Sequence, residues 1–404
     1  MRTNSHNGTM MLTEILFWTF LGIVFYTYLG YGILLFVLVW LKEHFISKPE
    51  FNLQKELEFP EISILIPAYN EESVVQSKME NTLNLNYPDE KLKIIWITDG
   101  STDLTNEILT TNYPQAELLF EQKRGGKTAA VNRAMKHIHT PIVVFTDANT
   151  MLNSDALLVI ARAFENSNVG CVAGEKRVMS KESDGAASSG EGIYWKYESY
   201  LKLLDSRLNT TVGAAGELFA IRSSLYEEME NDTLLDDFIL SMKIVLNGYK
   251  IEYCSNAYAI ESGSANIDEE RKRKVRISAG GIQSIIRLKQ LFNFFKYPLL
   301  SFQYISHRVL RWSLTPICLF SLLPINIALV IMTWNALYCT LLLLQIIIYA
   351  SALIGKNYSD RQIKHKVFYV PYYFLFMNYN VILGFSYYIR KSKGDGTWEK
   401  AKRA

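Results

Sequence analysis

The sequence predicts an α/β domain with a mostly parallel sheet, joined to transmembrane α-helices. Long apolar runs flank a central region, and within that region short β-rich runs alternate with helical patterns. Such βαβ alternation is typical of a parallel sheet covered by helices. We expect a membrane anchor in residues 1–55, a soluble domain in residues 56–275, interfacial helices in residues 276–312, and a transmembrane region with a basic tail in residues 313–404.

Ile15–Leu41 is nearly pure apolar sequence and is long enough to cross a bilayer with some tilt. No small-residue cleavage site follows it, so we interpret it as a retained anchor and not as a signal peptide. Three further spans are expected at residues 314–334, 336–354 and 367–388. The last is interrupted by Pro371, Asn378 and Asn380.

Basic residues near the spans predict the orientation, because cytoplasmic loops carry an excess of Lys and Arg. Lys42 and Lys48 follow the first span, and four basic residues lie between positions 355 and 367. Both places, and the soluble domain with them, should face the cytoplasm. However, three C-terminal spans would put the basic residues of positions 390–403 on the other side. Either the last segment does not cross, or one span is miscounted.

Gly281–Phe295 carries apolar residues at near-helical spacing together with Arg287, Lys289 and Lys296 beside them. This pattern indicates an amphipathic helix in the membrane interface. An ordinary helix that faces the protein core is the alternative.

Composition excludes several other classes of protein. A formal net charge of +2 argues against a dedicated nucleic-acid binder, which would carry a strong basic excess. The four cysteines form no CxxC pair and are expected to be free thiols. The six histidines show neither HxxxH nor HExxH spacing, so no zinc site is expected.

Polar clusters follow three of the four expected strands directly. The strands are residues 62–67, 92–98, 116–121 and 141–146, with helices near 71–84, 102–111 and 126–137. Clusters follow the first, second and fourth strands, at residues 67–71, 98–103 and 146–149. Each cluster alone could be a turn with helix caps. Because ligands of parallel sheets bind at the carboxyl ends of the strands, the three together predict a ligand site.

Arg124-Gly-Gly-Lys-Thr128 suggests a phosphate-binding loop. The complete motif requires a glycine where the chain has Glu121, so an ATPase is rejected. We still expect the Lys127 ammonium to lie near a diphosphate, because its positive charge stabilises the anion.

These residues together resemble glycosyltransferase family 2, and within it the processive membrane synthases of β-linked polysaccharides such as hyaluronan, cellulose, chitin and poly-N-acetylglucosamine. The resemblance covers about residues 61–312 and ends in Arg308-Val-Leu-Arg-Trp312, which matches the family's Q/R-x-x-R-W motif. It implies an A-type nucleotide-sugar glycosyltransferase domain. Any single motif is weak evidence, whereas their order is specific.

The resemblance also implies residue roles on the nucleotide side. Tyr69, Asn70 and Glu71 would form the loop beside the base, and Asp99 would hold the uridine. Lys127 and Asn132 match the family's Gly-Lys-x-x-Ala-x-Asn stretch near the nucleotide.

Asp147 stands where the family's metal-binding Asp-x-Asp begins, but the second aspartate is replaced by Asn149. The amide oxygen is neutral, so the affinity for the metal should fall without vanishing. Mg²⁺ or Mn²⁺ often takes one or two protein carboxylates and completes its shell with diphosphate and water.

On the acceptor side, Gly216 and Glu217 close a loop that resembles the family's acceptor-side loop. The family's Thr-Glu-Asp then corresponds to Leu235-Asp236-Asp237, which makes Asp237 the general base and puts Asp236 in the Glu place. An acidic cluster at a helix N-terminus is the plain alternative.

Arg308, Arg311 and Trp312 would contact the diphosphate and the acceptor sugar, since an indole offers a flat face to a sugar ring. They could equally form a membrane-interface anchor, and both roles can hold together.

The expected function is therefore inverting transfer from a UDP-sugar to a growing β-linked polysaccharide, coupled to export across a bacterial inner membrane. One alternative is transfer of a single sugar to a lipid-linked or short glycan acceptor. The other is an inactive scaffold subunit of an export complex. Expected partners are the UDP-sugar, the glycan acceptor and the lipid bilayer, with room for an accessory subunit or an oligomer.

Overall fold

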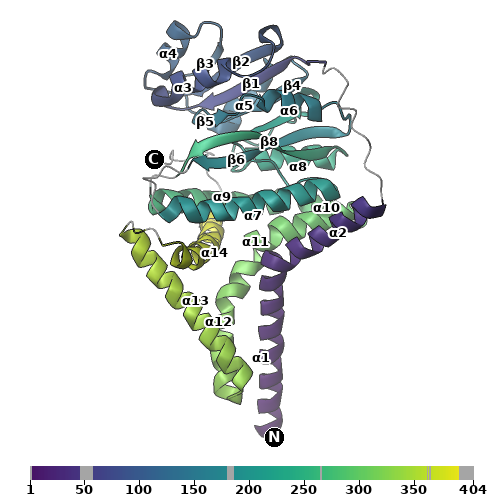
Figure 1. Ribbon diagram of the computed structural model, residues 1–404, viewed down its shortest axis with the longest axis vertical. Coiled ribbons are helices and arrows are strands. Elements are labelled where there is room, and N and C mark those ends of the chain that lie inside the picture. The colour runs from purple at the N-terminus through teal and green to yellow at the C-terminus, as the bar shows by residue number, and fades with distance from the viewer. Residues whose placement is uncertain are drawn as a thin grey trace.

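The computed structural model of the protein describes residues 2–45, 58–179, 186–263, 266–361, 363 and 365–390. Figure 1 shows three levels, with the sheet domain at the top, helices lying across beneath it, and a stalk of long helices below. The long helices of the middle level are α7 (Ala186–Leu208) and α9 (Ile267–Arg287). The soluble domain thus rests on helices and not directly on the stalk.

One eight-stranded sheet forms the soluble domain, in the order β3-β2-β1-β4-β7-β6-β8-β5. Its strands are β1 (Ile62–Ala68), β2 (Leu92–Asp99), β3 (Glu117–Glu121), β4 (Ile142–Phe145), β5 (Thr150–Leu152), β6 (Val169–Met179), β7 (Phe219–Arg222) and β8 (Lys250–Ser262). Strands β3, β2, β1 and β4 are parallel neighbours, as are β6 and β8. β7 runs antiparallel to β4 and β6, and β5 runs antiparallel to β8. The predicted mostly parallel sheet is confirmed, with the four expected strands correct to within one residue at either end.

Helices cover both faces of the sheet, as a mostly parallel sheet requires. Successive side chains of β1 point to opposite faces, so Ile64 packs in one core layer and Leu65 in the other. The first layer holds α3 (Glu72–Leu83), α4 (Thr105–Asn112) and α6 (Ala156–Ala163); the second holds α5 (Lys127–Met135) and α8 (Asp236–Leu246). The loops between strands and helices are therefore fixed from both sides.

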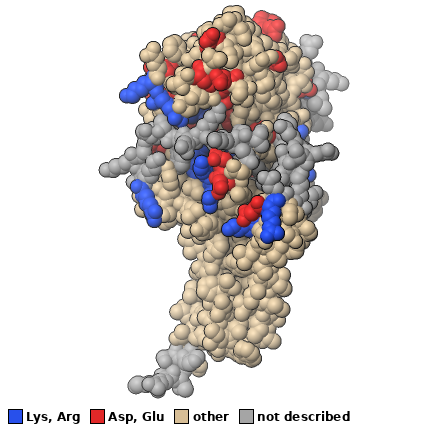
Figure 2. All heavy atoms as spheres, turned by 90° about the vertical axis from the view of Figure 1, so that its left-hand side faces the viewer, with Lys and Arg blue, Asp and Glu red and all other residues tan. Residues whose placement is uncertain are grey.

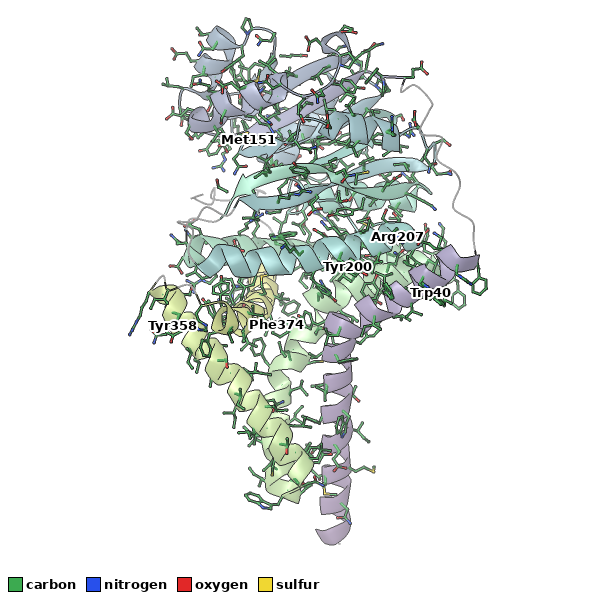
Figure 3. All side chains as sticks on the ribbon, in the orientation of Figure 1. Trp40, Met151, Tyr200, Arg207, Tyr358 and Phe374 are labelled. Carbon is green, nitrogen blue, oxygen red and sulfur yellow. The ribbon has the colours of Figure 1, made fainter. Side chains whose placement is uncertain are left out.

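The N-terminal apolar stretch is helical throughout but bends. α1 (Arg2–Phe25) and α2 (Tyr31–Phe45) are separated by a π-helical turn, Tyr26–Gly30, and Figure 1 shows α2 turning away from the line of α1. A π-turn interrupts the regular hydrogen-bond ladder and is a usual cause of a kink. α2 then packs on α7, where Arg207 bonds Glu43 at 2.8 Å from Nε. Figure 3 shows Arg207 near the end of α2 that carries Trp40.

Three helical stretches of the described residues are long and apolar enough to cross a membrane: Asn7–Phe45, α12 (Leu314–Thr333) and α13 (Ala336–Asp360). On the face in Figure 2 the stalk shows no charged side chain. α14 (Lys366–Arg390), expected to be a further span, is not one of them. Of the three expected C-terminal spans, α12 and α13 are therefore candidate spans by length and hydropathy, whereas α14 does not meet the same criterion.

α14 packs against α9 of the middle layer as well as against α13. A Cβ added at Gly384 would lie 2.4 Å from the Cβ of Ser278 in α9, so the two backbones touch. Tyr28 donates a 2.5 Å hydrogen bond to Oδ1 of Asn378, and its ring meets Phe374 with 4.8 Å between centroids. Figure 3 shows Phe374 on α14 beneath α7. The polar Asn378 and Asn380 are buried in this contact region, which is why the pattern departs from that of a span.

Two C-terminal spans would remove the conflict over orientation, because the chain would then return to the side of the sheet domain after α13. The basic tail after Arg390 lies outside the described residues, as do Lys48 and Lys364.

The expected amphipathic helix at residues 281–295 is also corrected. α9 ends at Arg287, and a short 3₁₀ turn follows at Lys289–Phe292. Ile282 is buried, and Leu288 and Leu291 pack in the domain core, whereas Phe295 is fully exposed. The core-facing alternative accounts for the first half of the segment, and the exposed aromatic side chains follow at its end.

Candidate active site

A cavity of about 1530 Å³ lies between the carboxyl ends of the parallel strands and the layer formed by α7, α9 and α14. Thirteen of the fifteen site residues expected from the sequence line it: Tyr69, Glu71, Asp99, Lys127, Asp147, Asn149, Gly216, Glu217, Asp236, Asp237, Arg308, Arg311 and Trp312. The volume exceeds the usual range for a single small ligand. It therefore has room for a second molecule beside a nucleotide sugar.

Asp99 organises the loop that precedes α5. Its carboxylate accepts backbone N–H bonds from Gly125 at 2.9 Å and Gly126 at 2.6 Å, and Arg133 pairs with it at 2.9 Å. The side chain is almost completely buried. Asp99 thereby holds the start of the helix that carries Lys127, while it still lines the cavity.

The loop after β1 is locked to the loop after β2. Asn70 has a left-handed backbone with φ of 54°, accepts a 2.8 Å bond from the backbone N–H of Thr102, and donates its own N–H to Ser101. Asparagine tolerates this conformation better than most residues. Asn70 lies outside the cavity lining, whereas Tyr69 beside it stacks under the Arg124 guanidinium, 3.8 Å from the ring centroid.

Asn132 is not brought to the cavity. Its amide donates to the Met229 carbonyl at 2.7 Å and accepts from the Tyr226 hydroxyl at 2.6 Å. The side chain is 4% exposed. Asn132 therefore fixes the loop before α8, and its expected role near the nucleotide has no support from this position.

Lys127 joins the two acidic groups of the site. Its Nζ lies 2.8 Å from Oδ1 of Asp147 and 3.9 Å from Oδ2 of Asp236. Burial by itself lowers the pKa of this ammonium, but Asp147 and Asp236 outweigh it and raise the pKa above its ordinary value. Lys127 therefore stays positively charged beside the place where a diphosphate would lie.

Asp147 and Asn149 both face the cavity and are the described residues best suited to a divalent cation. No group of three acidic, histidine or cysteine side chains suitable for a metal is found among the described residues. One carboxylate and one amide oxygen fit a hard cation that takes its remaining ligands from diphosphate and water. The Lys127 ammonium already bonds Asp147, so this carboxylate is placed to bind positive charge.

Asp237 is the second residue of α8 and lies close to both Lys127 and the loop that carries Gly216. Burial raises the pKa of its carboxyl to about 7, with a further contribution from the negative charge of Asp236. A pKa near the working pH is what a general base requires. The loop that carries Gly216 packs tightly against these two side chains. A Cβ added at Gly216 would lie 3.3 Å from Oδ2 of Asp237 and 3.5 Å from Nζ of Lys127.

Glu217 belongs to a buried ionic cluster beneath the acceptor-side loop. It pairs with Lys176 at 2.7 Å and with Arg273 at 3.0 Å, and both cations also pair with Glu261. Burial by itself raises the pKa of Glu217, but Lys176 and Arg273 outweigh it and hold that pKa well below its ordinary value. Glu217 is thus a fixed anion that anchors the loop to α9.

The Arg-Trp motif is held from α7 by one carboxylate. Glu198 pairs with Arg308 at 2.7 Å and with Arg311 at 2.9 Å, and it is 1% exposed. Trp312 packs edge-on against Phe238, which follows Asp237, with 5.1 Å between ring centroids. The motif therefore contacts both α8 and the middle layer, and it precedes α12 immediately.

The sequence reasoning missed two supporting side chains. Glu198 lies seven residues before Asp205 on α7, and both acids contact His307, at 3.3 Å and 2.5 Å. Lys78, on the apolar face of α3 between Val75 and Thr82, is fully buried and bonds Oγ1 of Thr146 and the carbonyl of Thr150. Charged residues at core positions of an amphipathic helix were the available signal in both cases.

Comparison with known proteins agrees with this geometry. Residues 60–280 match the family described as glycosyltransferase like family 2. Poly-beta-1,6-N-acetyl-D-glucosamine synthase of Staphylococcus aureus is 27% identical over 251 residues, which are 60% of this chain and 58% of that protein. Beta-monoglucosyldiacylglycerol synthase of a Nostoc species is 29% identical over 249 residues, 57% of this chain and 52% of that protein. The chain therefore spans just over half the length of these relatives.

The solved structure of the mannosyltransferase PcManGT from Pyrobaculum calidifontis, in complex with GDP-Man and Mn²⁺, superposes with a TM-score of 0.69. It is 19% identical in sequence, and the match covers 95% of this chain and 99% of that one. The shared fold thus includes the helical region as well as the sheet domain. Because the family match extends over more than half of the chain, from β1 through most of α9, the chain belongs to glycosyltransferase family 2.

Proposed function

We propose that the protein transfers a sugar with inversion from a UDP-sugar to a hydroxyl of a growing β-linked polysaccharide. The observation that carries this proposal is the position of Asp237, between the nucleotide-side loops and the Arg308–Trp312 motif in one cavity. Asp237 thus faces the part of the cavity in which the donor and the acceptor would meet. The poly-N-acetylglucosamine synthase among the relatives supports the same class of product.

The donor would lie along the strand ends. Tyr69 with Arg124 stacked on it offers a flat surface for the base, and Asp99 lies beside it in the lining. Lys127 would contact the diphosphate once it exchanges Asp147 for the phosphate oxygens. A divalent cation held by Asp147 and Asn149, when bound, would neutralise part of the charge on the diphosphate.

In the transfer step Asp237 accepts the proton of the acceptor hydroxyl. The hydroxyl oxygen forms a bond to the anomeric carbon while the bond from that carbon to the phosphate oxygen breaks, and UDP leaves with the electron pair. Attack from the face opposite the leaving group inverts an α-linked donor to a β-linked product. Arg308 and Arg311 would stabilise the negative charge that develops on UDP.

Transfer of a single sugar to a lipid is the second candidate. The end of the cavity away from the strands is lined by Leu29 of the N-terminal helix and by apolar residues of α14, among them Phe374 and Met377. An acceptor with a hydrocarbon part would fit there, and one relative is named for a diacylglycerol product. In either case the sheet domain would work on the cytoplasmic face of a bacterial inner membrane, with the membrane helices supporting acceptor entry and polymer export.

The test is sugar transfer by the purified full chain in detergent, with Mg²⁺ or Mn²⁺. UDP release is measured with UDP-glucose, UDP-N-acetylglucosamine, UDP-galactose and UDP-glucuronic acid, and GDP release with GDP-mannose, since the solved relative holds that donor. Turnover with one UDP-sugar and a long product by gel and mass spectrometry is expected. Turnover with GDP-mannose alone would overturn the choice of donor, and a product with one added sugar would favour the second candidate.

A further inference from the structure

Lys202 is a buried cation without a partner in the wall of the cavity. It lies on α7, is 4% exposed, and belongs to the lining. Among the side chains that the structure describes, none bonds or ion-pairs with its Nζ. Placing an ammonium in such a position is costly unless an anion compensates it.

The other cations around Lys202 each have an acidic partner. Lys176 pairs with Glu217 at 2.7 Å, Lys274 with Glu270 at 3.1 Å, and Arg308 with Glu198 at 2.7 Å. Glu217, Glu270 and Glu198 are thus each paired with another cation. Lys202 is the exception in this group.

Aromatic rings near Lys202 do not replace an anion. The Trp195 and Tyr253 ring centroids lie 5.9 Å and 6.0 Å from its Nζ, at the outer limit of a cation–π contact. Burial, together with the like charge of Arg308, lowers the pKa of Lys202 from its ordinary value. Glu198, Glu217 and Asp237 act in the opposite direction but do not outweigh these two effects.

The position of Lys202 distinguishes it from the nucleotide side. The charged groups that act on Lys202 are Arg308, Glu198, Glu217 and Asp237, whereas Lys127 pairs with Asp147 and Asp236. A ligand group that reached Lys202 would therefore lie past Asp237, where the acceptor enters.

We propose that Lys202 is the centre of an acceptor subsite that binds a negatively charged group, a carboxylate or a phosphate, carried by the acceptor. That the ligand is the acceptor rests on the proposed function, whereas the anion site itself rests on the burial and surroundings of Lys202. A carboxylate would come from an acidic sugar, and a phosphate from a lipid headgroup that enters between α7 and α14. In both cases the ligand supplies the partner that the protein omits.

The experiment measures binding, so that it does not depend on turnover. The purified full chain is saturated with UDP and Mg²⁺ to occupy the nucleotide side. Binding of methyl β-glucuronide, glycerol 1-phosphate and neutral methyl β-glucoside is then measured by saturation-transfer NMR and by calorimetry. We expect at least one anionic probe to bind at least tenfold more tightly than the glucoside, and the stronger of the two identifies the carboxylate or the phosphate as the natural group.

Three variants complete the test. Lys202→Met should lose the preference for the anionic probe, Lys202→Arg should retain it, and both should bind UDP as the parent does. Lys272→Met removes a solvated charge from the same cavity and should change little, which controls for the general field. Equal binding of all three probes, no binding of any, or an unchanged preference in Lys202→Met would overturn the proposal. Absence of UDP release with every donor would count against the proposed function and leave these binding results standing.

Discussion

Asp237→Asn separates the role of Asp237 in catalysis from its effect on stability. Asparagine keeps the shape of the side chain but cannot accept the proton of the acceptor hydroxyl. Loss of a general base typically lowers the rate by about 10²- to 10⁴-fold. Binding of UDP should persist, because the nucleotide loops lie on the other side of Lys127.

The same substitution should stabilise the fold at alkaline pH. The pKa of Asp237 rises from 3.8 to about 7 on folding, so ionising it costs more in the folded protein than in the unfolded chain. The fold therefore keeps its full stability below pH 4 and loses stability as pH rises through 7. Three pKa units correspond to about 4 kcal/mol at most, and water in the cavity reduces this to roughly 1–2 kcal/mol.

Thermal unfolding and UDP release at pH 5 and pH 8 provide the assay. At pH 8 Asp237→Asn should melt at a higher temperature than the parent, and at pH 5 the difference should shrink. The parent's turnover should rise with pH through about 7. Asp236→Asn is the matched control: removal of its charge lowers the pKa of Asp237, so the rise should move to lower pH while activity persists. Normal turnover by Asp237→Asn, or a melting difference independent of pH, would refute the reasoning.

Three further predictions concern the supporting side chains. Glu198→Ala removes the carboxylate shared by the two motif arginines, so the free energy of unfolding should fall by roughly 3–5 kcal/mol in a denaturant titration, with a smaller loss for Glu198→Gln. Lys78→Met removes the two bonds that hold the ends of the Asp147 loop, and calorimetry should show affinity for Mn²⁺ with UDP about 10-fold weaker; unchanged affinity would remove Lys78 from the metal site. Gly213→Ala combines a φ of +83° with a Cβ 2.1 Å from the Phe238 ring, so kcat should fall more than KM rises, and a parent-like kcat would contradict the tight fit.

Much of the fold followed from the sequence because its signals are local. Hydrophobic period and strand-end clusters predicted four strands and the loops of Asp99 and Asp147, since side-chain alternation and turn chemistry act over a few residues. The α14 segment shows the limit of such local signals. A run with few charges looks alike whether lipid or protein covers it, and the contact of Gly384 with α9 becomes visible only in the tertiary structure.

The ionic clusters could not be predicted in this way. Glu198 meets Arg311 across more than a hundred residues of chain, and Lys176 meets Glu261 from another strand. The local sequence around a buried charged residue does not indicate which distant residue pairs with it. The unpaired state of Lys202 was likewise visible only after its neighbours had been placed.

The sequence by itself determined the class of protein: an α/β domain between apolar helices, with an ordered set of acidic and basic motifs that marks a glycosyltransferase. The tertiary structure decided how the helices pack beneath the sheet, which motif residues reach the cavity, and what charge each one meets there. The physical reason is the distance along the chain over which each effect acts. Backbone propensity and hydrophobic pattern are properties of neighbouring residues, whereas the protonation of Asp237 and the pairing of Arg308 depend on groups that only folding brings together.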